Sequence, residues 1–341
     1  MKITVILCTY NRSKSLAIAL ESVAASILPE SVAWEVLVVD NNSSDQTGAI
    51  VEGFCHRHPR RFRYLFEPRP GKSNALATGI REASGEILVF TDDDVIVEPT
   101  WIQNLTANLH EREWAGAGGR TLPERSFLLP RWLLLEERIW DLLGCFDRGP
   151  DVRELTEPPF GNNMAYRRKM FEKYGGFRTD LGPQPGDQIR SEDTEFGHRL
   201  LAAGERLRYE PSAVVYHSIP ENRIQRDYVL SWWYDKARAE IRASGSEPGA
   251  RYYFAGIPLV LMRRLAMGTL RWIFAIESSR RFSNKVKVWY VTGRILECRN
   301  LAVSTRRGRR QRFADDPAIS SPPDPKMGQA SDGMAVRVKK R

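Results

Sequence analysis

The sequence predicts an α/β fold in which a mostly parallel sheet carries helices on both faces. Within the first hundred residues, continuous apolar runs typical of buried strands alternate with segments whose apolar residues recur at the helical period. Polar residues directly follow three of these strands. The chain has 341 residues, 42% of them hydrophobic, which is enough for one large domain or two smaller ones with a substantial core.

The predicted elements follow in order along the chain. Strands rich in Val, Ile, Leu and Phe are expected at residues 3–10, 34–43, 61–68 and 86–90. Helices are expected between them at residues 13–26, 46–58 and 71–84. An amphipathic helix is expected at residues 129–146, and a loop leading into a short helix at 158–177. A further helix is expected at 191–204, with Ser191 as its N-cap and Gly204 as its stop, followed by a strand at 205–218 that ends in His217.

Beyond residue 220 the sequence becomes basic and aromatic. One helix is expected at residues 226–245, and an apolar segment at 252–276 is interrupted by Arg263, Arg264 and Arg271. The arginines leave no uninterrupted apolar run of the roughly 18–20 residues that a spanning helix needs, so we expect an amphipathic helix that lies in the membrane plane. The expected parts are an enzyme domain (1–220), a basic helical region (221–305) and a disordered basic tail (306–341).

The net charge of +9 is unevenly distributed. Residues 1–220 carry a net charge of −5, and residues 221–341 carry +14. An anionic membrane surface is the partner expected for the basic part, whose aromatic helices either bind lipid or pack as a soluble subdomain. The four cysteines lack CxxC spacing, and the N-terminus reads as a strand without a signal peptide. We therefore expect a cytoplasmic protein, peripheral on the inner face of the cell membrane.

Asp92, Asp93 and Asp94 directly follow the strand at 86–90. Three like charges repel one another, so a cation is expected to neutralise them. Strand alternation predicts that Asp92 and Asp94 point to one side and Asp93 to the other. Two carboxylates suit Mg²⁺ or Mn²⁺, which also binds phosphate oxygens. The alternative is an exposed acidic turn before the next helix.

Other polar residues are expected at the same edge of the sheet, where the carboxyl ends of parallel strands meet. Asp40 would contact a ribose or base, or would simply form a turn. Glu192 and Asp193 begin a helix whose dipole is expected to hold them ionised, which suits a general base. His217 would be a metal ligand or a hydrogen-bonded structural residue.

Eight motifs, taken in order, resemble those of the family 2 glycosyltransferases, which have the GT-A fold. They lie within residues 3–220 and read VILCTYNR, VLVVDNNSSD, PGKSNALATGI, ILVFTDDDV, GNNMAYRR, YGGF, SEDTEFGHRLLAAGERLRYEP and VVYH. The resemblance implies a nucleotide-diphospho-sugar transferase with a Rossmann-like sheet, followed here by a C-terminal α-helical region. Two positions depart from the family: Leu76 stands where many relatives carry Arg, and Val95 where a fourth carboxylate is usual.

The resemblance also implies roles for individual residues. The donor nucleotide would lie against Thr9, Tyr10, Arg12, Asp40, Asn42, Lys72, Asp92 and Asp93. Asp92 and Asp94 match the metal-binding DxD motif, with His217 as a further ligand. Asp193, beside Glu192, matches the general base of the ED motif. Asn163, Gly175 and Gly176 match segments that line the donor sugar and the acceptor.

The reaction implied is transfer of a hexose from a UDP-, GDP- or dTDP-linked donor to a hydroxyl group, with inversion and with Mn²⁺ or Mg²⁺ as cofactor. The acceptor would be a saccharide or a lipid-linked glycan in cell-surface polysaccharide or lipid-linked glycan synthesis. A nucleotidyltransferase is an alternative. Such an enzyme is expected to have a Gly-rich N-terminal loop, and the corresponding segment TYNRSKS has no glycine. A nucleic-acid-binding protein is a further alternative suggested by RRGRRQR; without a recognition module, no nucleic-acid partner is expected.

Overall fold

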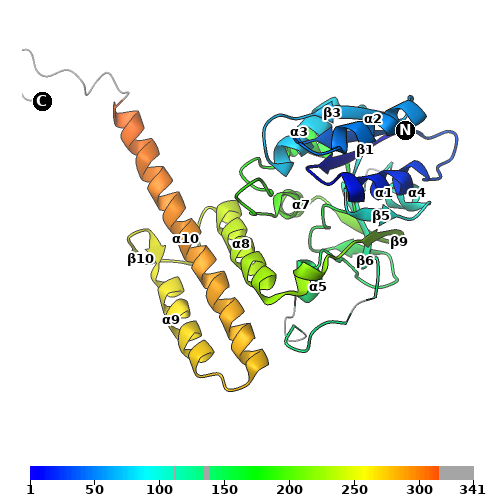
Figure 1. Cartoon of the computed structure of the whole chain (residues 1–341). Helices are drawn as coiled ribbons and strands as arrows, with labels where there is room; N and C mark the ends of the chain where they lie inside the picture. The colour runs from blue at the N-terminus through cyan, green and yellow to red at the C-terminus, as the bar shows by residue number, and fades with distance from the viewer. Residues whose placement is uncertain (111–112, 127, 134–137, 315–341) are drawn as a thin grey trace, which may run out of the picture. The chain divides into compact units, whose positions relative to one another are not determined.

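A central sheet with helices on both faces confirms the predicted α/β class (Figure 1). The computed structural model describes residues 1–110, 113–126, 128–133 and 138–314. Within these residues the sheet has nine strands, in the order β3-β2-β1-β4-β8-β6-β9-β5, with β7 paired to β9. The strands are β1 (Lys2–Thr9), β2 (Ala33–Asp40), β3 (Phe62–Phe66), β4 (Ile87–Asp92), β5 (Val95–Val97), β6 (Gly116–Pro123), β7 (Arg153–Leu155), β8 (Met164–Arg167) and β9 (Leu207–His217).

The first four strands pair in parallel, as the alternation of strands and helices predicted. Strand β6 is also parallel to β9, whereas β5, β7 and β8 are antiparallel to their neighbours. The sheet is therefore parallel through the strands that carry the predicted nucleotide site and mixed beyond them.

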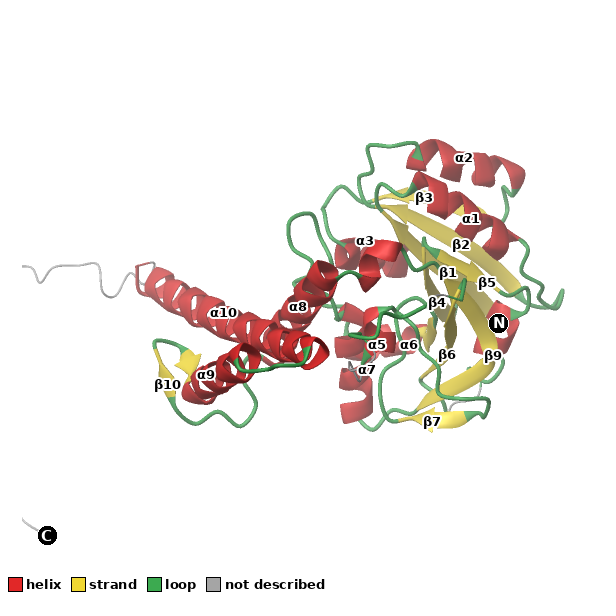
Figure 2. Ribbon diagram, turned by 60° about the horizontal axis from the view of Figure 1, so that its bottom comes forward, coloured by secondary structure: helices red, strands yellow, loops and turns green. Residues whose placement is uncertain are grey.

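Two apolar clusters cover the two faces of the sheet, and Figure 2 shows the helices that lie on these faces. Helices α1 (Ser13–Ala24), α2 (Thr47–Arg57) and α4 (Trp101–Thr106) pack on one face. Helices α3 (Lys72–Glu82), α6 (Arg168–Tyr174) and α7 (Glu192–Ala202) pack on the other. Alternate residues of β1 enter opposite clusters, for example Val5 and Ile6, because successive strand side chains point to opposite faces.

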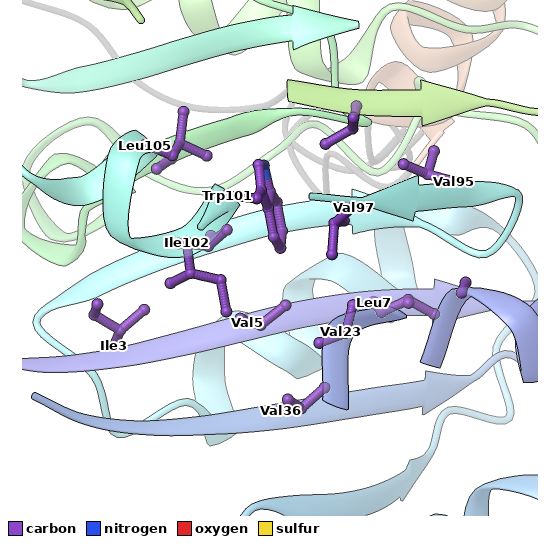
Figure 3. Packing of buried hydrophobic residues seen from close by; sticks show 14 of the residues in the cluster. Ile3, Val5, Leu7, Val23, Val36, Val95, Val97, Trp101, Ile102 and Leu105 are labelled. Atoms are coloured by element: carbon purple, nitrogen blue, oxygen red, sulfur yellow. The ribbon is translucent and has the colours of Figure 1, made fainter. Parts of the chain in front are cut away.

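Trp101 occupies the middle of the first cluster. Its side chain is fully buried, and Figure 3 shows the indole among Val5, Val97 and Ile102. Its ring nitrogen donates a hydrogen bond to the Asn163 side chain at 2.8 Å. The segment directly after the three aspartates is thereby anchored in the core.

The C-terminal elements are the 3-10 helix η1 (Glu221–Ile224), α8 (Arg226–Ser244), the hairpin strands β10 (Tyr253–Phe254) and β11 (Ile257–Pro258), α9 (Leu259–Ile273) and α10 (Ser278–Ala314). The chain divides into two compact units, Met1–Arg299 and Asn300–Arg341. Residues 221–299, predicted as part of a separate region, therefore belong to the same unit as the sheet. None of the helices described is both long and apolar enough to cross a bilayer.

Three predicted helical or disordered segments differ from the structure. Instead of a helix over 129–146, a short helix α5 (Ile139–Leu142) forms, because Gly144 has φ +71° and Phe146 pairs with Thr121; residues 134–137 lie outside the described part. The segment 252–276 begins as the β10–β11 hairpin, turning through Gly256 (φ +83°), before α9. Helix α10 continues to Ala314, so disorder predicted from residue 306 is wrong as far as 314, and 315–341 lie outside the described residues.

We expect alanine to have opposite effects at two helical glycines. A Cβ at Gly79 in α3 would lie 2.6 Å from Ile6 Cγ2 in the core, whereas one at Gly53 in α2 would have no neighbour within 4 Å. Gly79→Ala should lower the free energy of unfolding by about 1–3 kcal/mol, because the buried Ile6 has little room to move. Gly53→Ala should raise it by up to about 1 kcal/mol through helix propensity. Urea unfolding would measure both, and shifts in the same direction would contradict the packing described.

Candidate functional site at the carboxyl edge of the sheet

The predicted crevice is formed by the carboxyl ends of β1, β2 and β4. Thr9 lies beside Asp40 in the β1–β2 register, and Cys8 lies beside Asp92 in the β1–β4 register. The loops that follow these strands therefore leave the sheet at one edge. The sequence prediction that the three polar clusters meet is confirmed by this register.

The three consecutive aspartates bind basic side chains of the protein itself. Lys72 Nζ, at the start of α3, lies 2.6 Å from Asp92 Oδ1. Arg12 Nη1, in the loop after β1, lies 3.2 Å from Asp93 Oδ1 and 2.5 Å from Asp94 Oδ2. The charges of the three aspartates are thus partly balanced by basic side chains of the protein.

The predicted alternation of these aspartates does not hold. Strand β4 ends at Asp92, and Asp93 and Asp94 form the turn before β5, so strand geometry no longer separates them. Arg12 contacts Asp93 and Asp94 together. Asp93 also accepts a hydrogen bond from the Thr9 hydroxyl at 2.8 Å, and its burial raises its pKa to about 7.

Asp94 belongs to a second group with His217 and Arg223. His217, at the end of β9, is buried, and its Nδ1 donates to the Leu143 carbonyl oxygen at 2.8 Å. Its Nε2 lies 3.5 Å from Asp94 Oδ1 and accepts from Arg223 Nη1 at 3.2 Å. Burial opposes ionisation of Asp94, but the positive charges of Arg12 and Arg223 beside it lower its pKa below the ordinary value.

Arg223 was missed by sequence reasoning. It lies in η1, six residues after His217, and its Nη2 is 3.6 Å from Asp94 Oδ2. The sequence gives little indication of this role, because Arg223 is one of many arginines in a basic region. Only the turn after β9 brings it back to the aspartates.

This donor set can hold a divalent cation in part. The Leu143 carbonyl fixes the proton on His217 Nδ1, which leaves the Nε2 lone pair directed at the space beside Asp94, as in a histidine metal ligand. Among the described residues there is no group of three or more His, Cys, Asp or Glu that could hold a metal ion. Asp94 and His217 therefore fit a cation that takes its remaining ligands from a bound substrate or water.

Asp193 lies in the first turn of α7 and is held from two sides. Its Oδ2 accepts from the Gly161 amide at 2.7 Å, and its Oδ1 accepts from the Thr194 amide at 2.7 Å. A Cβ on Gly161 would lie 3.0 Å from Asp193 Oδ2, so the close approach favours glycine. Ser191 is the N-cap residue of α7, as predicted, but it has φ +89° and its hydroxyl makes no capping hydrogen bond.

Glu192 differs from the ionised carboxylate predicted at this helix start. It is buried, and burial together with the charge of Asp193 raises its pKa to about 7, in spite of Lys72. Lys72 Nζ lies 3.9 Å from Glu192 Oε1 and 2.6 Å from Asp92 Oδ1. One lysine thereby connects the ED motif on α7 with the aspartates after β4.

Asp40 is buried with both oxygens in use. Oδ1 accepts from the Ser43 amide and Oδ2 from the Tyr64 hydroxyl, each at 2.9 Å, as in the turn-forming alternative. Tyr10 and Asn42 are exposed beside it at the strand ends. Asn41, which sequence reasoning did not select, accepts from the Gly71 amide at 2.8 Å and so fixes the residue before Lys72.

Three residues predicted on the sugar side, Asn163, Gly175 and Gly176, make contacts that stabilise the fold. The buried Asn163 bonds Trp101 and donates to the carbonyls of Arg120 and Ala213. Gly175 ends α6 with φ +79°, and the Gly176 carbonyl accepts from Arg199. Within the described residues, no hydrogen bond or ion pair joins these three to the aspartates.

Removing the Glu192 carboxylate should change how stability depends on pH. Because folding raises the Glu192 pKa from 4.5 to about 7, the folded state holds a proton in this interval that the unfolded chain has lost. The free energy of unfolding should therefore fall as the pH rises through this window. Glu192→Gln should match the wild type near pH 5 and exceed it at pH 8 by up to about 3 kcal/mol.

Urea unfolding across this pH range would test the prediction. Glu172→Gln is the matched control, because Glu172 is exposed on α6 and has no hydrogen bond or ion pair among the described residues. It should retain the pH dependence of the wild type. A Glu192→Gln variant with an unchanged pH dependence would contradict the buried, proton-holding Glu192.

Comparisons with known proteins agree with the geometry. The family model described as "Glycosyl transferase family 2" matches residues 4–175, half of the chain. The chain is 28% identical over 246 residues to a glucosyl-dolichyl phosphate glucuronosyltransferase of Haloferax volcanii, covering 68% of this chain and 75% of that protein. It is 25% identical over 221 residues to a poly-beta-1,6-N-acetyl-D-glucosamine synthase of Staphylococcus epidermidis, covering 64% of this chain but only half of that protein.

A solved structure shares the fold at low identity. A mannosyltransferase from Pyrobaculum calidifontis, in complex with GDP-Man and Mn²⁺, has a TM-score of 0.54 and 19% identity, covering 93% of this chain and 80% of that one. Such a likeness shows the GT-A fold alone. Together with the match to the family model, the converging strand ends identify the chain as a member of glycosyl transferase family 2.

Proposed function

We propose that the protein is a metal-dependent, inverting glycosyltransferase that moves a sugar from a nucleoside diphosphate to a hydroxyl acceptor. The observation that carries the proposal is the convergence of Arg12, Lys72 and Arg223 on Asp92, Asp93 and Asp94 at one edge of the sheet. Family membership supplies the reaction class.

The basic side chains suit a diphosphate. Arg12 and Arg223 can donate hydrogen bonds to phosphate oxygens. Lys72 can bind a phosphate through the charge of its flexible side chain. When these cations turn to the donor, Asp94 and His217 become available to a metal. Bound Mn²⁺ or Mg²⁺ would supply charge stabilisation to the diphosphate leaving group. The mannosyltransferase bound to GDP-Man and Mn²⁺ supports this assignment.

Asp193 is the residue proposed as general base. Two backbone amides hold its carboxylate in a fixed position, and Lys72 links its helix to the donor side. The base removes the acceptor proton while the hydroxyl oxygen attacks the anomeric carbon opposite the leaving group, which inverts that carbon. A lipid-linked or growing saccharide acceptor is supported by the names of the relatives, one acting on a dolichyl phosphate glycan and one a polysaccharide synthase.

Donor binding should depend on both the metal and the aspartates. Thermal unfolding with UDP-, GDP- and dTDP-sugars, with and without Mn²⁺ or Mg²⁺, should show stabilisation by one nucleotide family only when metal is present. Asp92→Ala/Asp94→Ala should lose it. The control Asp151→Ala/Glu172→Ala removes two exposed carboxylates outside the site and should retain it. Stabilisation that is independent of metal and equal in both variants would refute the proposed site.

Asp193→Asn should lower turnover by about 10²–10⁴-fold, the usual size of general base catalysis, and leave donor affinity nearly unchanged. Glu195→Gln is the matched control, since Glu195 stands in the same helical turn but pairs with Arg199 at 2.7 Å. Its turnover should stay near that of the wild type. NMR of the product with the active donor would test inversion directly. Wild-type turnover by Asp193→Asn would show that another group is the base.

A further inference from the structure

The β10–β11 hairpin and α9 expose a large apolar surface. We name it the hairpin–α9 surface and define it by the exposed side chains of Tyr252, Phe254, Met262, Leu270, Ile273 and Phe274. Tyr252 and Phe274 are 75% and 76% exposed, far more than large apolar side chains of a folded domain usually are. The hairpin is joined directly to the start of α9, where the Leu259 amide donates to the Tyr252 carbonyl.

Helix α9 has two apolar faces rather than one. One face packs against α10: Leu261 is fully buried, a Cβ on Gly268 would lie 3.4 Å from Val288, and Trp272 meets Trp289 at 5.8 Å between ring centroids. Figures 1 and 2 show the two helices side by side. Leu259, Met262, Leu270 and Ile273 fall at helical spacing on a different face and are exposed. Protein packing therefore explains only the first face.

A basic groove lies between α9 and α10, next to the exposed apolar face of α9. Its volume is about 380 Å³, and Arg263, Arg264, Arg271 and Lys287 line it together with Val260 and Met267. Arg264 is paired with Glu247 at 3.0 Å, whereas the other three cations have no ion pair among the described residues. Residues 251–287 contain eight Lys or Arg and one Asp or Glu. The groove is thus suited to an anion.

We propose that the hairpin–α9 surface docks on an anionic phospholipid bilayer, with its exposed apolar side chains in the membrane–water interface and lipid phosphates in the basic groove. Amphipathic helices with cations beside an apolar face bind membranes in this way. The excess of cations in residues 251–287 favours an anionic partner, and an anionic bilayer offers lipid phosphates directly beside an apolar interior. A second copy of this chain would place eight like charges against eight. Vesicle binding needs no sugar nucleotide, so this proposal is independent of the reaction proposed above.

The structure separates this surface from α8, which the sequence placed in the same basic aromatic region. Trp232 and Trp233 pack against one another at 5.0 Å between centroids, and Trp233 packs against Tyr290 of α10. Trp232 and Trp233 also flank the cluster that contains the buried Val229 and Leu230. The tryptophans of α8 thus pack against protein, as in the alternative of a soluble helical subdomain. The proposal of lipid binding rests on α9 and the hairpin alone.

Co-sedimentation of the full chain with vesicles tests the proposal. Vesicles of phosphatidylcholine with about 30% phosphatidylglycerol should bind at least about tenfold more protein than phosphatidylcholine alone, and salt should weaken binding because it screens the cations. Leu270→Glu/Ile273→Glu and Arg263→Glu/Arg271→Glu/Lys287→Glu should each lower binding by about tenfold or more. The matched control Arg60→Glu/Arg153→Glu/Lys169→Glu makes the same charge change at exposed sites of the sheet domain and should bind nearly as the wild type does. Circular dichroism would confirm that every variant is folded.

Several outcomes would overturn the proposal. Equal loss in the groove variant and in the control would show that only net charge matters. Equal binding to neutral and anionic vesicles would remove the role of the groove. Full competition by soluble glycerol phosphate, with the Leu270→Glu/Ile273→Glu variant still bound, would identify a site for free anions. A dimer in light scattering that Leu270→Glu/Ile273→Glu abolishes, without vesicle binding, would show that a second copy covers the surface.

Discussion

Neutralisation of the consecutive aspartates by basic side chains organises the carboxyl edge of the sheet. Asp93 and Asp94 are largely buried, and a buried charge without a partner costs several kcal/mol. The partners come from three separate elements: Arg12 from the loop after β1, Lys72 from α3 and Arg223 from η1. The ion pairs therefore bring together residues that are far apart in the chain.

Lys72 is the most constrained member of this network. Asn41 holds the Gly71 amide, the Lys72 amide donates to the Pro183 carbonyl at 3.0 Å, and the Ser73 hydroxyl donates to the Leu181 carbonyl at 2.6 Å. The end of β2 and the segment leading to α7 are thus tied to the start of α3. Because the Lys72 ammonium then lies between Asp92 and Glu192, the charge state of the donor side is coupled to that of the ED motif.

The same network suits a site that must bind and release an anionic donor. Ion pairs between side chains can exchange for contacts with phosphate without leaving carboxylates unpaired, provided a metal takes the place of the departing cations. The C-terminal helices are tied down differently. Arg238 of α8 pairs with Asp187, and Arg242 pairs with Glu297 of α10. The β10–β11 hairpin and the exposed apolar face of α9 have no such cover among the described residues.

Local patterns were enough to establish strands β1 to β4, the helices between them and the polar strand ends, because fully buried parallel strands read as continuous apolar runs. They also located Asp92–Asp94, the ED motif and His217, since these stand at element ends marked in the sequence. Tertiary structure alone decided that Arg223 reaches Asp94, that burial raises the pKa of Glu192, that Asn163 bonds Trp101 in the core and which face of α9 stays exposed. Charge state and pairing depend on burial beside residues far away in the chain, which periodicity along the chain does not record.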